Sequence, residues 1–363
     1  MVHAIANKVT RRTPYLVIEI KKVIEAVQSF HKRFGVRSVY YATKANPDKS
    51  VVTLLNKLNC NFEVSSSGEL KTIMSLKIPA SRIISASSIK NPDFINAAYK
   101  AGIRYFTADS ISEIEMIAFH APGSKVSIRL NVSNEGSEWP LSRKFGVDLG
   151  EGVRLLKSAE QIGLIPWGLS FHVGSQCTRL ETWAEALDTA REFWDLAAAK
   201  NLHLKSLNLG GGFPIQYRKP VIGINEIADI VFINIKKKFP PIQEIIVEPG
   251  RAIIGHAGTM VSSLIAKADR DGKKWFYLDV GVFNGLMESI GGIKYPITVN
   301  GKEPISKCVL AGPSCDGFDV IDTEIELPDI EIGQRVYISS AGAYTTAYAS
   351  KFDGSPIPKV VLV

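Results

Sequence analysis

Hydrophobic and polar positions alternate between two patterns along the N-terminal two thirds of the chain. Short apolar runs, many of them β-branched, predict strands at 38–44, 61–65, 83–87, 104–108, 125–131, 166–172, 206–210 and 244–248. Between them, apolar residues recur three or four positions apart and predict helices at 48–59, 67–77, 91–102, 110–120, 149–163, 180–200 and 224–239. Several helices open with Asp, Ser or Asn, which cap helix N-termini.

Eight strands that alternate with helices predict an α/β fold, a (β/α)8 barrel of the TIM type over residues 20–251. A doubly wound open sheet has the same rhythm and stays an alternative, because periodicity does not report closure. After Arg251 the pattern changes to strand-like runs with Gly and Pro turns, at 275–278, 334–338 and 359–363. We expect a second, mostly β domain of sandwich or barrel type over 252–363, to which the N-terminal strand within 1–19 returns.

Composition and charge narrow the class of partner. The chain has 363 residues and a formal net charge of +7. Its basic residues are dispersed, and the longest run, at 236–238, ends a predicted helix, where cations are favourable. This favours a solvated surface over a nucleic-acid partner. No apolar run reaches the roughly 18 residues that span a bilayer. The N-terminus shows no signal-peptide pattern, so we expect a cytoplasmic protein without a membrane partner.

The four cysteines, Cys60, Cys177, Cys308 and Cys315, show no CxxC spacing. A disulfide framework or a zinc site is therefore not expected, and each thiol must be judged singly.

One lysine stands where the first barrel strand ends. The stretch YYATKANP, residues 40–47, runs from apolar residues into an Asn-Pro turn signal and places Lys44 at the strand end. A desolvated lysine loses its proton easily, and the neutral amine can attack a carbonyl to form a Schiff base. An ordinary lysine at the solvent edge of a strand fits this octet equally well.

Functional side chains also follow the other predicted strands. In a barrel the C-terminal ends of all strands meet at one face, where catalytic groups lie. The residues at these ends are Lys44, Glu63, Ser88, Asp109, Arg129, His172, Gly210, Gly211, Gly212 and Glu248. We therefore expect a site at this face.

Three of these strand ends indicate a phosphate and a flat ring. The three glycines in LGGGFP let the backbone present N–H groups to an anion, although a tight turn needs them too. In EPGR, Arg251 could bind the same phosphate and Glu248 could hold a proton on a ring nitrogen; a surface salt bridge between the two is the alternative. In FHVGSQ, His172 suits stacking on a flat cofactor and Ser175 suits a phosphate.

The β domain adds two turns with reactive groups. GPSCDGFD places Cys315, a proton donor, beside Asp316, and GAYT places Tyr344 at another turn. A partly buried thiol and a packing aromatic are the alternatives. Together, a Schiff-base lysine, a phosphate nest, an acid for a ring nitrogen and a stacking histidine describe pyridoxal 5'-phosphate (PLP).

At this point the chain resembles a known family, the alanine-racemase-type (fold type III) PLP-dependent decarboxylases, in the ornithine/lysine decarboxylase branch. The resemblance covers nearly the whole chain, with YATKANP, FEVSSSGE, PLSRKFGV, FHVGSQ, LGGGFP, EPGR, GPSCDGFD and GAYT in family order. Alanine racemase itself leaves GPSCDGFD unexplained, and diaminopimelate decarboxylase usually shows a glutamate after the cysteine, where this chain has Asp316.

The resemblance implies a role for each matching residue. Lys44 would carry PLP, Glu248 would pair with the pyridine nitrogen, His172 would stack on the ring, and Glu63 would lie nearby. The phosphate would be surrounded by Ser175, Gly210, Gly211, Gly212, Gly250, Arg251 and Tyr344, with Arg129 and Lys144 supporting the site. Cys315 would protonate the α-carbon and Asp316 would meet the distal end of the substrate, both from the partner subunit of a homodimer with shared active sites.

The implied activity is that of a carboxy-lyase, an L-amino-acid α-decarboxylase that forms a polyamine precursor from ornithine or lysine. Phe283 would wall the substrate pocket, although plain packing also explains it. Past Glu288, where the family carries a second acidic residue, this chain has Gly291, Gly292 and then Lys294. Decarboxylation of a biosynthetic intermediate, of siderophore, antibiotic, carboxylated polyamine or diaminopimelate type, is therefore an alternative, and a non-catalytic PLP-binding regulator is a second one.

Overall fold

The computed structural model describes residues 11–141, 144–300 and 302–363. The chain forms two compact units. Of the described residues, the barrel unit takes those within Val27–Pro214 and Ile222–Gly250, and the β unit takes 11–26 and those within Ile215–Val221 and Arg251–Val363. The sequence-based limits 20–251 and 252–363 stay a prediction of where separate domains begin and end.

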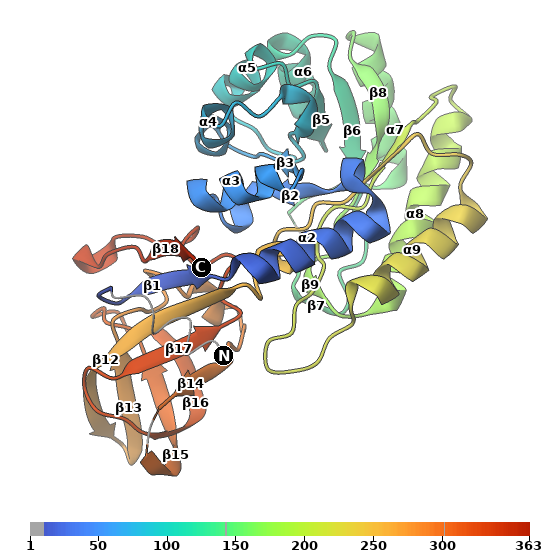
Figure 1. Cartoon of the computed structure of the whole chain (residues 1–363). Coiled ribbons are helices and arrows are strands. Elements are labelled where there is room, and N and C mark those ends of the chain that lie inside the picture. The colour runs from blue at the N-terminus through green and yellow to red at the C-terminus, as the bar shows by residue number, and fades with distance from the viewer. Residues whose placement is uncertain (1–10, 142–143, 301) are drawn as a thin grey trace. The chain divides into compact units, whose positions relative to one another are not determined.

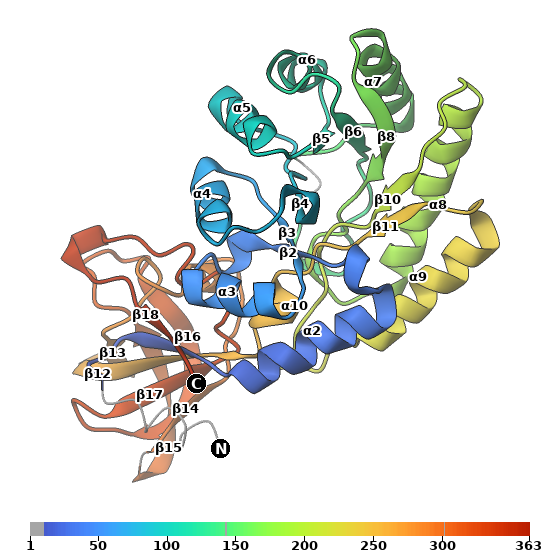
Figure 2. The same cartoon turned by 45° about the horizontal axis from the view of Figure 1, so that its top comes forward.

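Eight parallel strands of the barrel unit form a closed ring (Figures 1 and 2). They are β2 (Tyr40–Ala42), β3 (Asn61–Glu63), β4 (Ile83–Ile84), β5 (Tyr105–Ala108), β6 (Lys125–Arg129), β8 (Ile165–Ser170), β10 (Ser206–Asn208) and β11 (Glu244–Ile246). Parallel bridges from Ser85 to Phe106 and from Val39 to Val247 join the run β2-β3-β4 to the run β5-β6-β8-β10-β11 at both ends. The predicted barrel is confirmed, and the open-sheet alternative is wrong.

Each barrel strand up to β10 is followed by a helix. These are α3 (Lys49–Lys57), α4 (Ser67–Ser75), α5 (Pro92–Lys100), α6 (Ile111–His120), α7 (Leu149–Gln161), α8 (Leu180–Ala198) and α9 (Ile224–Lys238). In five of them the side chain of the N-cap residue accepts a backbone N–H, at Asp48, Ser66, Asn91, Ser110 and Asp148. The seven predicted helices and their Asp, Ser or Asn caps are confirmed.

A large helix was missed by the sequence analysis. Helix α2 (Ile20–Phe34) leads from the β unit into the barrel unit and buries Val23, Val27 and Phe30. Two short strands, β7 (Ser137–Trp139) and β9 (Ser175–Cys177), pair antiparallel and were also not predicted. Short 3-10 turns lie at Val36–Ser38, Thr43–Ala45, Ala80–Arg82, Met287–Ser289 and Phe352–Gly354.

The interior of the ring is packed with large side chains. Tyr40, Ile84, Tyr105 and Ile246 form one buried cluster, against which Trp167 packs. Because these residues come from strands on different sides of the ring, they meet only inside it. The barrel is therefore a filled core, and its functional groups are left to the strand ends.

The β unit is a sheet in the order β14-β17-β12-β13-β15-β16. Its strands are β1 (Tyr15–Ile18), β12 (Gly258–Arg270), β13 (Lys273–Leu278), β14 (Ile297–Val299), β15 (Lys302–Ala311), β16 (Val320–Asp329), β17 (Arg335–Ser339) and β18 (Lys359–Leu362). The N-terminal β1 pairs antiparallel with β12 and parallel with β18, so it lies within this sheet.

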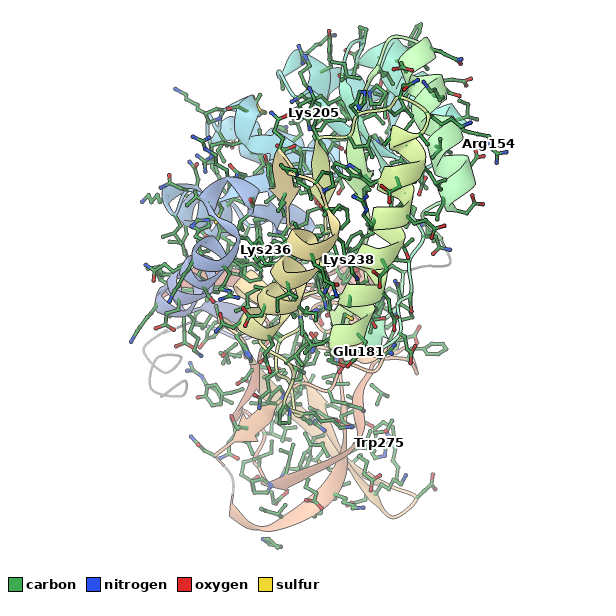
Figure 3. All side chains as sticks on the ribbon, turned by 90° about the vertical axis from the view of Figure 1, so that its right-hand side faces the viewer. Arg154, Glu181, Lys205, Lys236, Lys238 and Trp275 are labelled. Carbon is green, nitrogen blue, oxygen red and sulfur yellow. The ribbon has the colours of Figure 1, made fainter. Side chains whose placement is uncertain are left out.

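The basic run 236–238 lies at the C-terminal end of α9, as predicted, and Figure 3 shows Lys236 and Lys238 there. Lys238 forms an ion pair with Asp188 of α8. Among the described residues, no helix combines the length and the apolar character that a bilayer crossing requires.

A buried ion pair fixes the loop after β4. Lys90 Nζ lies 2.6 Å from Glu113 Oε1, and it donates to the carbonyl oxygens of Ser87 at 2.7 Å and Thr107 at 2.6 Å. We expect Lys90→Met to lower the free energy of unfolding by about 3–5 kcal/mol, because Glu113 becomes an unpaired buried charge. Denaturant unfolding followed by circular dichroism measures the loss.

An exposed pair supplies the matched control. Lys157 Nζ lies 2.9 Å from Glu160 Oε2 on α7, with both side chains partly exposed. Lys157→Met should cost less than about 1 kcal/mol, since solvent screens this pair. Equal losses in the two variants would contradict the role given to burial.

Candidate functional site

Lys44 is held by a buried carboxylate at the C-terminal ends of β2 and β3. The sequence analysis placed Lys44 at the end of the strand. In the structure the strand β2 ends at Ala42, and Lys44 lies on the 3-10 turn Thr43–Ala45 that follows. Its Nζ donates to Glu63 Oε2 over 3.1 Å, and the Glu63 side chain is fully buried. The other oxygen, Glu63 Oε1, accepts the hydroxyl of Ser65 at 2.7 Å. Because 48% of the Lys44 side chain is exposed, the amine is oriented and still accessible to a ligand.

His172 presents a flat, uncharged ring just past β8. The N–H of Gly174 donates to His172 Nδ1 at 3.0 Å, so the neutral imidazole carries its proton on Nε2. Lost hydration lowers the pKa of His172 well below its usual value, and the charges of Arg129 and Lys44 lower it further. The ring is therefore neutral at pH 7 and suited to stacking.

The triple-glycine turn after β10 passes directly against this ring. Gly210 and Gly212 have φ of +66° and +98°, in the region that favours glycine. A Cβ on Gly211 would lie 3.2 Å from His172 Nε2 and 2.8 Å from the carbonyl oxygen of Glu248. The turn therefore packs too closely against His172 and the Glu248 backbone for any side chain at position 211.

Glu248 is a buried carboxyl group with an unusual proton affinity. Asn208 Nδ2 donates to Glu248 Oε1 over 2.6 Å, and both residues are buried. Burial raises the pKa of Glu248 to about 7, and the charge of Glu63 adds to the rise. Lys44 and the bond from Asn208 oppose it. A carboxyl group with a pKa near neutrality can share a proton with a ring nitrogen.

Arg129 supplies a second cation at the same strand ends. Its guanidinium carbon lies 5.0 Å from the centre of the Phe145 ring. Burial lowers the pKa of Arg129, whereas Glu248, Asp109 and Glu63 oppose this change by attraction. The strand-end face therefore collects acids and bases that set one another's charge.

The other residues predicted in the barrel unit also follow its strands. Ser88 is buried in the loop after β4, and Asp109 Oδ2, just past β5, accepts the N–H of Gly146 at 2.8 Å. Ser175 begins β9, and Lys144 Nζ lies 5.1 Å from the centre of the Phe145 ring.

The β unit holds a second group around Arg251, the first residue of α10 (Arg251–Ile254). Its Nη1 and Nη2 lie 2.6 and 2.7 Å from the two carboxylate oxygens of Glu288, and Nη1 also donates to Tyr217 Oη at 2.6 Å. The guanidinium carbon lies 4.9 Å from the centre of the Tyr344 ring, which sits on a residue with φ of +54°. Glu248 is thus paired with Asn208 and Arg251 with Glu288, and all four side chains are buried. The alternative of a surface salt bridge between Glu248 and Arg251 does not fit these contacts.

Cys315 is exposed at the tip of a loop that one aspartate braces. Asp319 Oδ1 accepts the N–H of Val282 at 2.7 Å, and its Oδ2 accepts the N–H of Ser314 at 2.9 Å. Asp316 Oδ1 accepts the N–H of Phe318, whose side chain is 74% exposed. The thiol and an aromatic ring are therefore presented to the outside of the β unit on a fixed loop.

Phe283 has a packing partner in the same unit. Its ring centre lies 4.8 Å from that of Phe352, and its carbonyl oxygen accepts the N–H of Ser350 at 2.8 Å. The packing alternative therefore accounts for at least part of its position.

The matched family is described as pyridoxal-dependent decarboxylase, pyridoxal binding domain, and the match spans residues 20–255. The chain belongs to this family.

Relatives of this decarboxylase family cover almost the whole chain. The lysine/ornithine decarboxylase of Selenomonas ruminantium is 35% identical over 346 residues, which are 94% of this chain and 87% of that protein. The structure of SrLDC in complex with PLP and cadaverine has a TM-score of 0.91 at 33% identity, covering 99% and 92% of the two chains. That of the Paramecium bursaria Chlorella virus arginine decarboxylase bound to agmatine has a TM-score of 0.91 at 27% identity, covering 99% and 100%. The fold class and the family recognised in the sequence are confirmed.

Sequence reasoning missed four residues that position the predicted ones in this family member. Ser65 and Asn208 lie two residues from Glu63 and Gly210, inside stretches already singled out, so local polar side chains beside a site residue were the available signal. Tyr217 and Glu288 lie 34 and 37 residues from Arg251, and no local pattern links them to it.

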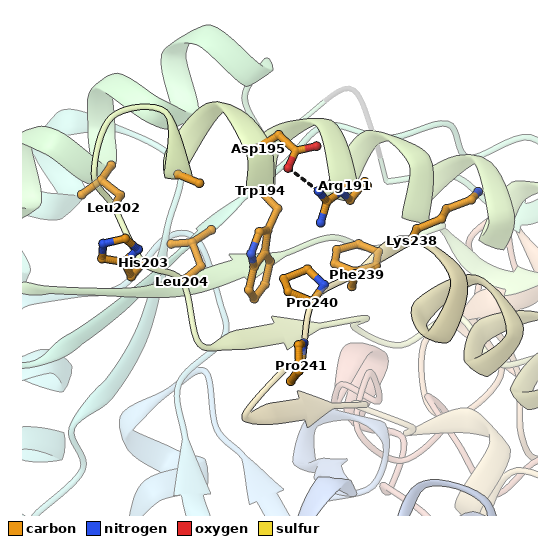
Figure 4. Close-up of a pocket in the computed structure, with 11 residues that line it drawn as sticks. Arg191, Trp194, Asp195, Leu202, His203, Leu204, Lys238, Phe239, Pro240 and Pro241 are labelled. Atoms are coloured by element: carbon orange, nitrogen blue, oxygen red, sulfur yellow. Dashed lines mark hydrogen bonds and ion pairs between the residues drawn. The ribbon is translucent and has the colours of Figure 1, made fainter.

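A separate cavity of about 470 Å³ in the decarboxylase barrel unit contains none of these residues (Figure 4). Trp194 of α8 and the loops before β10 and β11 line it, away from the strand ends that carry Lys44. Its rim cations, Arg191 and Lys238, are paired with Asp195 and Asp188. Because these charges are compensated, the cavity is not assigned to an anionic ligand.

The raised pKa of Glu248 predicts a pH-dependent stability. Between pH 4.5 and about 7, the native protein keeps a proton on Glu248 that the unfolded chain has released. This contribution is complete below pH 4.5 and is lost as the pH rises to 7. In the cofactor-free wild type, the free energy of unfolding should therefore fall by up to about 3 kcal/mol over this window. Glu248→Gln should abolish this fall.

The measurement is denaturant unfolding at pH 5 and pH 7, compared between wild type and variant. His172 acts with the opposite sign below pH 6.5, because its native pKa is lowered, so only the difference between the two proteins isolates Glu248. Asn208→Ala removes a bond that lowers the pKa of Glu248 and should enlarge the fall. Parallel pH profiles for wild type and Glu248→Gln would contradict the raised pKa.

Proposed function

We propose that the protein is a PLP-dependent L-amino-acid α-decarboxylase in which Lys44 carries the cofactor. The observation that supports this best is the 3.1 Å contact between Lys44 Nζ and Glu63, at the strand ends that also carry a neutral His172 and the protonatable Glu248. Family membership and relatives named as decarboxylases point the same way.

The residues at these strand ends suit the cofactor. An aldehyde needs a reachable amine, which Lys44 offers with about half of its side chain exposed. A pyridine ring needs a flat neighbour and a proton partner, which His172 and Glu248 offer at the same strand ends.

When bound, PLP withdraws electrons from the α-carbon of the substrate, so that the bond to the carboxylate can break. The residues of the chain would bind the cofactor, orient it and transfer protons. Glu63 orients the Lys44 amine, Glu248 would share a proton with the ring nitrogen, and His172 would hold the ring plane. Arg129 balances the charge of the two glutamates.

The phosphate would contact backbone N–H groups of Gly210, Gly211, Gly212 and Gly250 together with Ser175, Arg251 and Tyr344. Three peptide units separate Glu248 from Arg251, so chain connectivity keeps their Cα atoms within about 11 Å of each other. An arginine in this covalent position suits a phosphate because its planar N–H groups match phosphate oxygens.

Cys315 and Asp316 would act in the active site of a partner subunit, in a homodimer with shared sites. In support, the loop that carries them is braced by Asp319 and presents Cys315 and Phe318 to the outside. An exposed thiol and a 74% exposed phenylalanine on a rigid loop are typical of a surface that another chain covers.

The substrate we favour is ornithine or lysine, giving a polyamine precursor, with Asp316 at its distal ammonium and Phe283 along its side. The segment after Glu288 offers no second carboxylate, and Gly291 and Gly292 are exposed there. This favours, as the second candidate, a biosynthetic intermediate with a bulkier distal group.

A cation in this segment does not argue for an acidic substrate. Lys294 Nζ donates to Asp322 Oδ1 at 3.0 Å, and Asp322 Oδ2 also accepts Arg218 Nη2 at 2.7 Å. The lysine is thus tied to β16 and its charge is partly compensated.

A covalent link at Lys44 predicts a visible absorbance band in the protein loaded with PLP. Lys44→Ala should abolish the band and decarboxylation, because no other amine takes its place. Absorbance spectra of purified, PLP-treated wild type and variant test this, with Lys49→Ala of α3 as the control that should keep the band. A band that survives in Lys44→Ala would defeat the assignment.

A panel of amino acids separates the two substrate candidates and tests Cys315. Carbon dioxide release from ornithine, lysine, arginine, diaminopimelate and carboxylated polyamine precursors should be fastest with ornithine or lysine.

Cys315→Ala should slow amine formation about 10²-fold or more, since it removes a proton donor. Unchanged turnover and product in this variant would remove Cys315 from the reaction.

A further inference from the structure

A buried ion pair of the β unit, with two hydrogen bonds, holds the arginine expected at the phosphate. Glu288 meets Arg251 through two bonds of 2.6 and 2.7 Å, and both side chains are 3% exposed. Such a fork fixes both the position and the plane of a guanidinium, which a single bond does not. Arg251 is therefore held before any ligand arrives.

Two tyrosines complete the clamp from other segments. Tyr217 Oη lies 2.6 Å from Arg251 Nη1, and the Tyr344 ring lies 4.9 Å from the guanidinium carbon. Burial alone lowers the pKa of Arg251, but Tyr217 and Glu288 more than offset it and keep the pKa above the usual value. The guanidinium thus stays protonated while its net charge is matched by Glu288.

We propose that Glu288 and Tyr217 are positioning residues, which set the direction of the Arg251 N–H groups and thereby the preference of the enzyme for a phosphorylated cofactor. The proposal rests on the proposed function. Because Glu288 cancels the charge of Arg251, plain attraction between opposite charges contributes little, and the alignment of N–H groups decides how well a phosphate binds. Both residues contact Arg251 directly and would act through it.

The test compares two aldehydes that differ only in the phosphate, PLP and pyridoxal. Their dissociation constants are measured by absorbance titration of the cofactor-free full-length protein. Glu288→Gln should weaken PLP binding about tenfold, because Arg251 loses one of the two bonds that fix its plane, and this loss should outweigh the attraction gained by removing the carboxylate. Tyr217→Phe, which keeps the ring and loses only the hydroxyl, should weaken it about threefold. Pyridoxal binding should change less than about twofold in both variants, since no phosphate is present.

Controls separate positioning from general loss of structure. Glu324→Gln, an exposed glutamate paired with Lys307 in the same unit, should leave the ratio of the two dissociation constants unchanged. A purely structural role for Glu288 predicts equal losses for PLP and pyridoxal, which would overturn the proposal. Unchanged or tighter PLP binding in Glu288→Gln would overturn it as well. If Glu288→Gln fails to fold by circular dichroism, Tyr217→Phe decides by the same ratio.

Failure of the proposed function looks different. Wild-type protein would then bind PLP no more tightly than pyridoxal and show no band that depends on Lys44. If the wild type prefers PLP and both variants keep this preference, only the inference about Glu288 and Tyr217 is contradicted.

Discussion

The closure of the strand ring is the constraint on which the rest of the barrel unit depends. Backbone hydrogen bonds from Tyr40 to Val247 and from Val247 to Ser38 join the first strand to the last. Since all strands of the ring are parallel, their C-terminal ends lie at one face, and closure brings the ends of the first and last strands together. Lys44 thereby opposes the rise in the pKa of Glu248, although about two hundred residues separate them in sequence. In an open sheet, β2 and β11 would be opposite edges.

Once these groups share a face, burial and neighbouring charges decide their protonation. A glutamate and a histidine taken from water both shift towards their neutral forms, so Glu248 gains a proton and His172 loses one. Glu63 remains paired with Lys44, the residue proposed to carry the cofactor. Chemistry near pH 7 is therefore set by the environment and not by the residue types alone.

Much of this was predictable because it is local. Strand and helix positions follow from apolar spacing, helix starts follow from capping side chains, and a strand end followed by a polar residue marks the functional face. Helix α2 escaped because it follows β1 directly and opens with Ile20, Lys21 and Lys22. No capping residue precedes it, and cations oppose the dipole at a helix N-terminus. Its apolar residues do recur at helical spacing, but the sequence carries no signal for where the helix starts.

What the sequence left open is which buried partner each charged residue takes. EPGR reads as one motif, yet Glu248 folds with the barrel unit beside Asn208, and Arg251 folds with the β unit beside Glu288. Sequence adjacency predicted a mutual pair, whereas burial demands a dedicated partner for each charge, because an unpaired one costs several kcal/mol. The partner of Arg251 lies 37 residues away, in a segment that attracted attention only for an acid it lacks. A motif therefore locates a functional residue, and the fold decides what holds it in place.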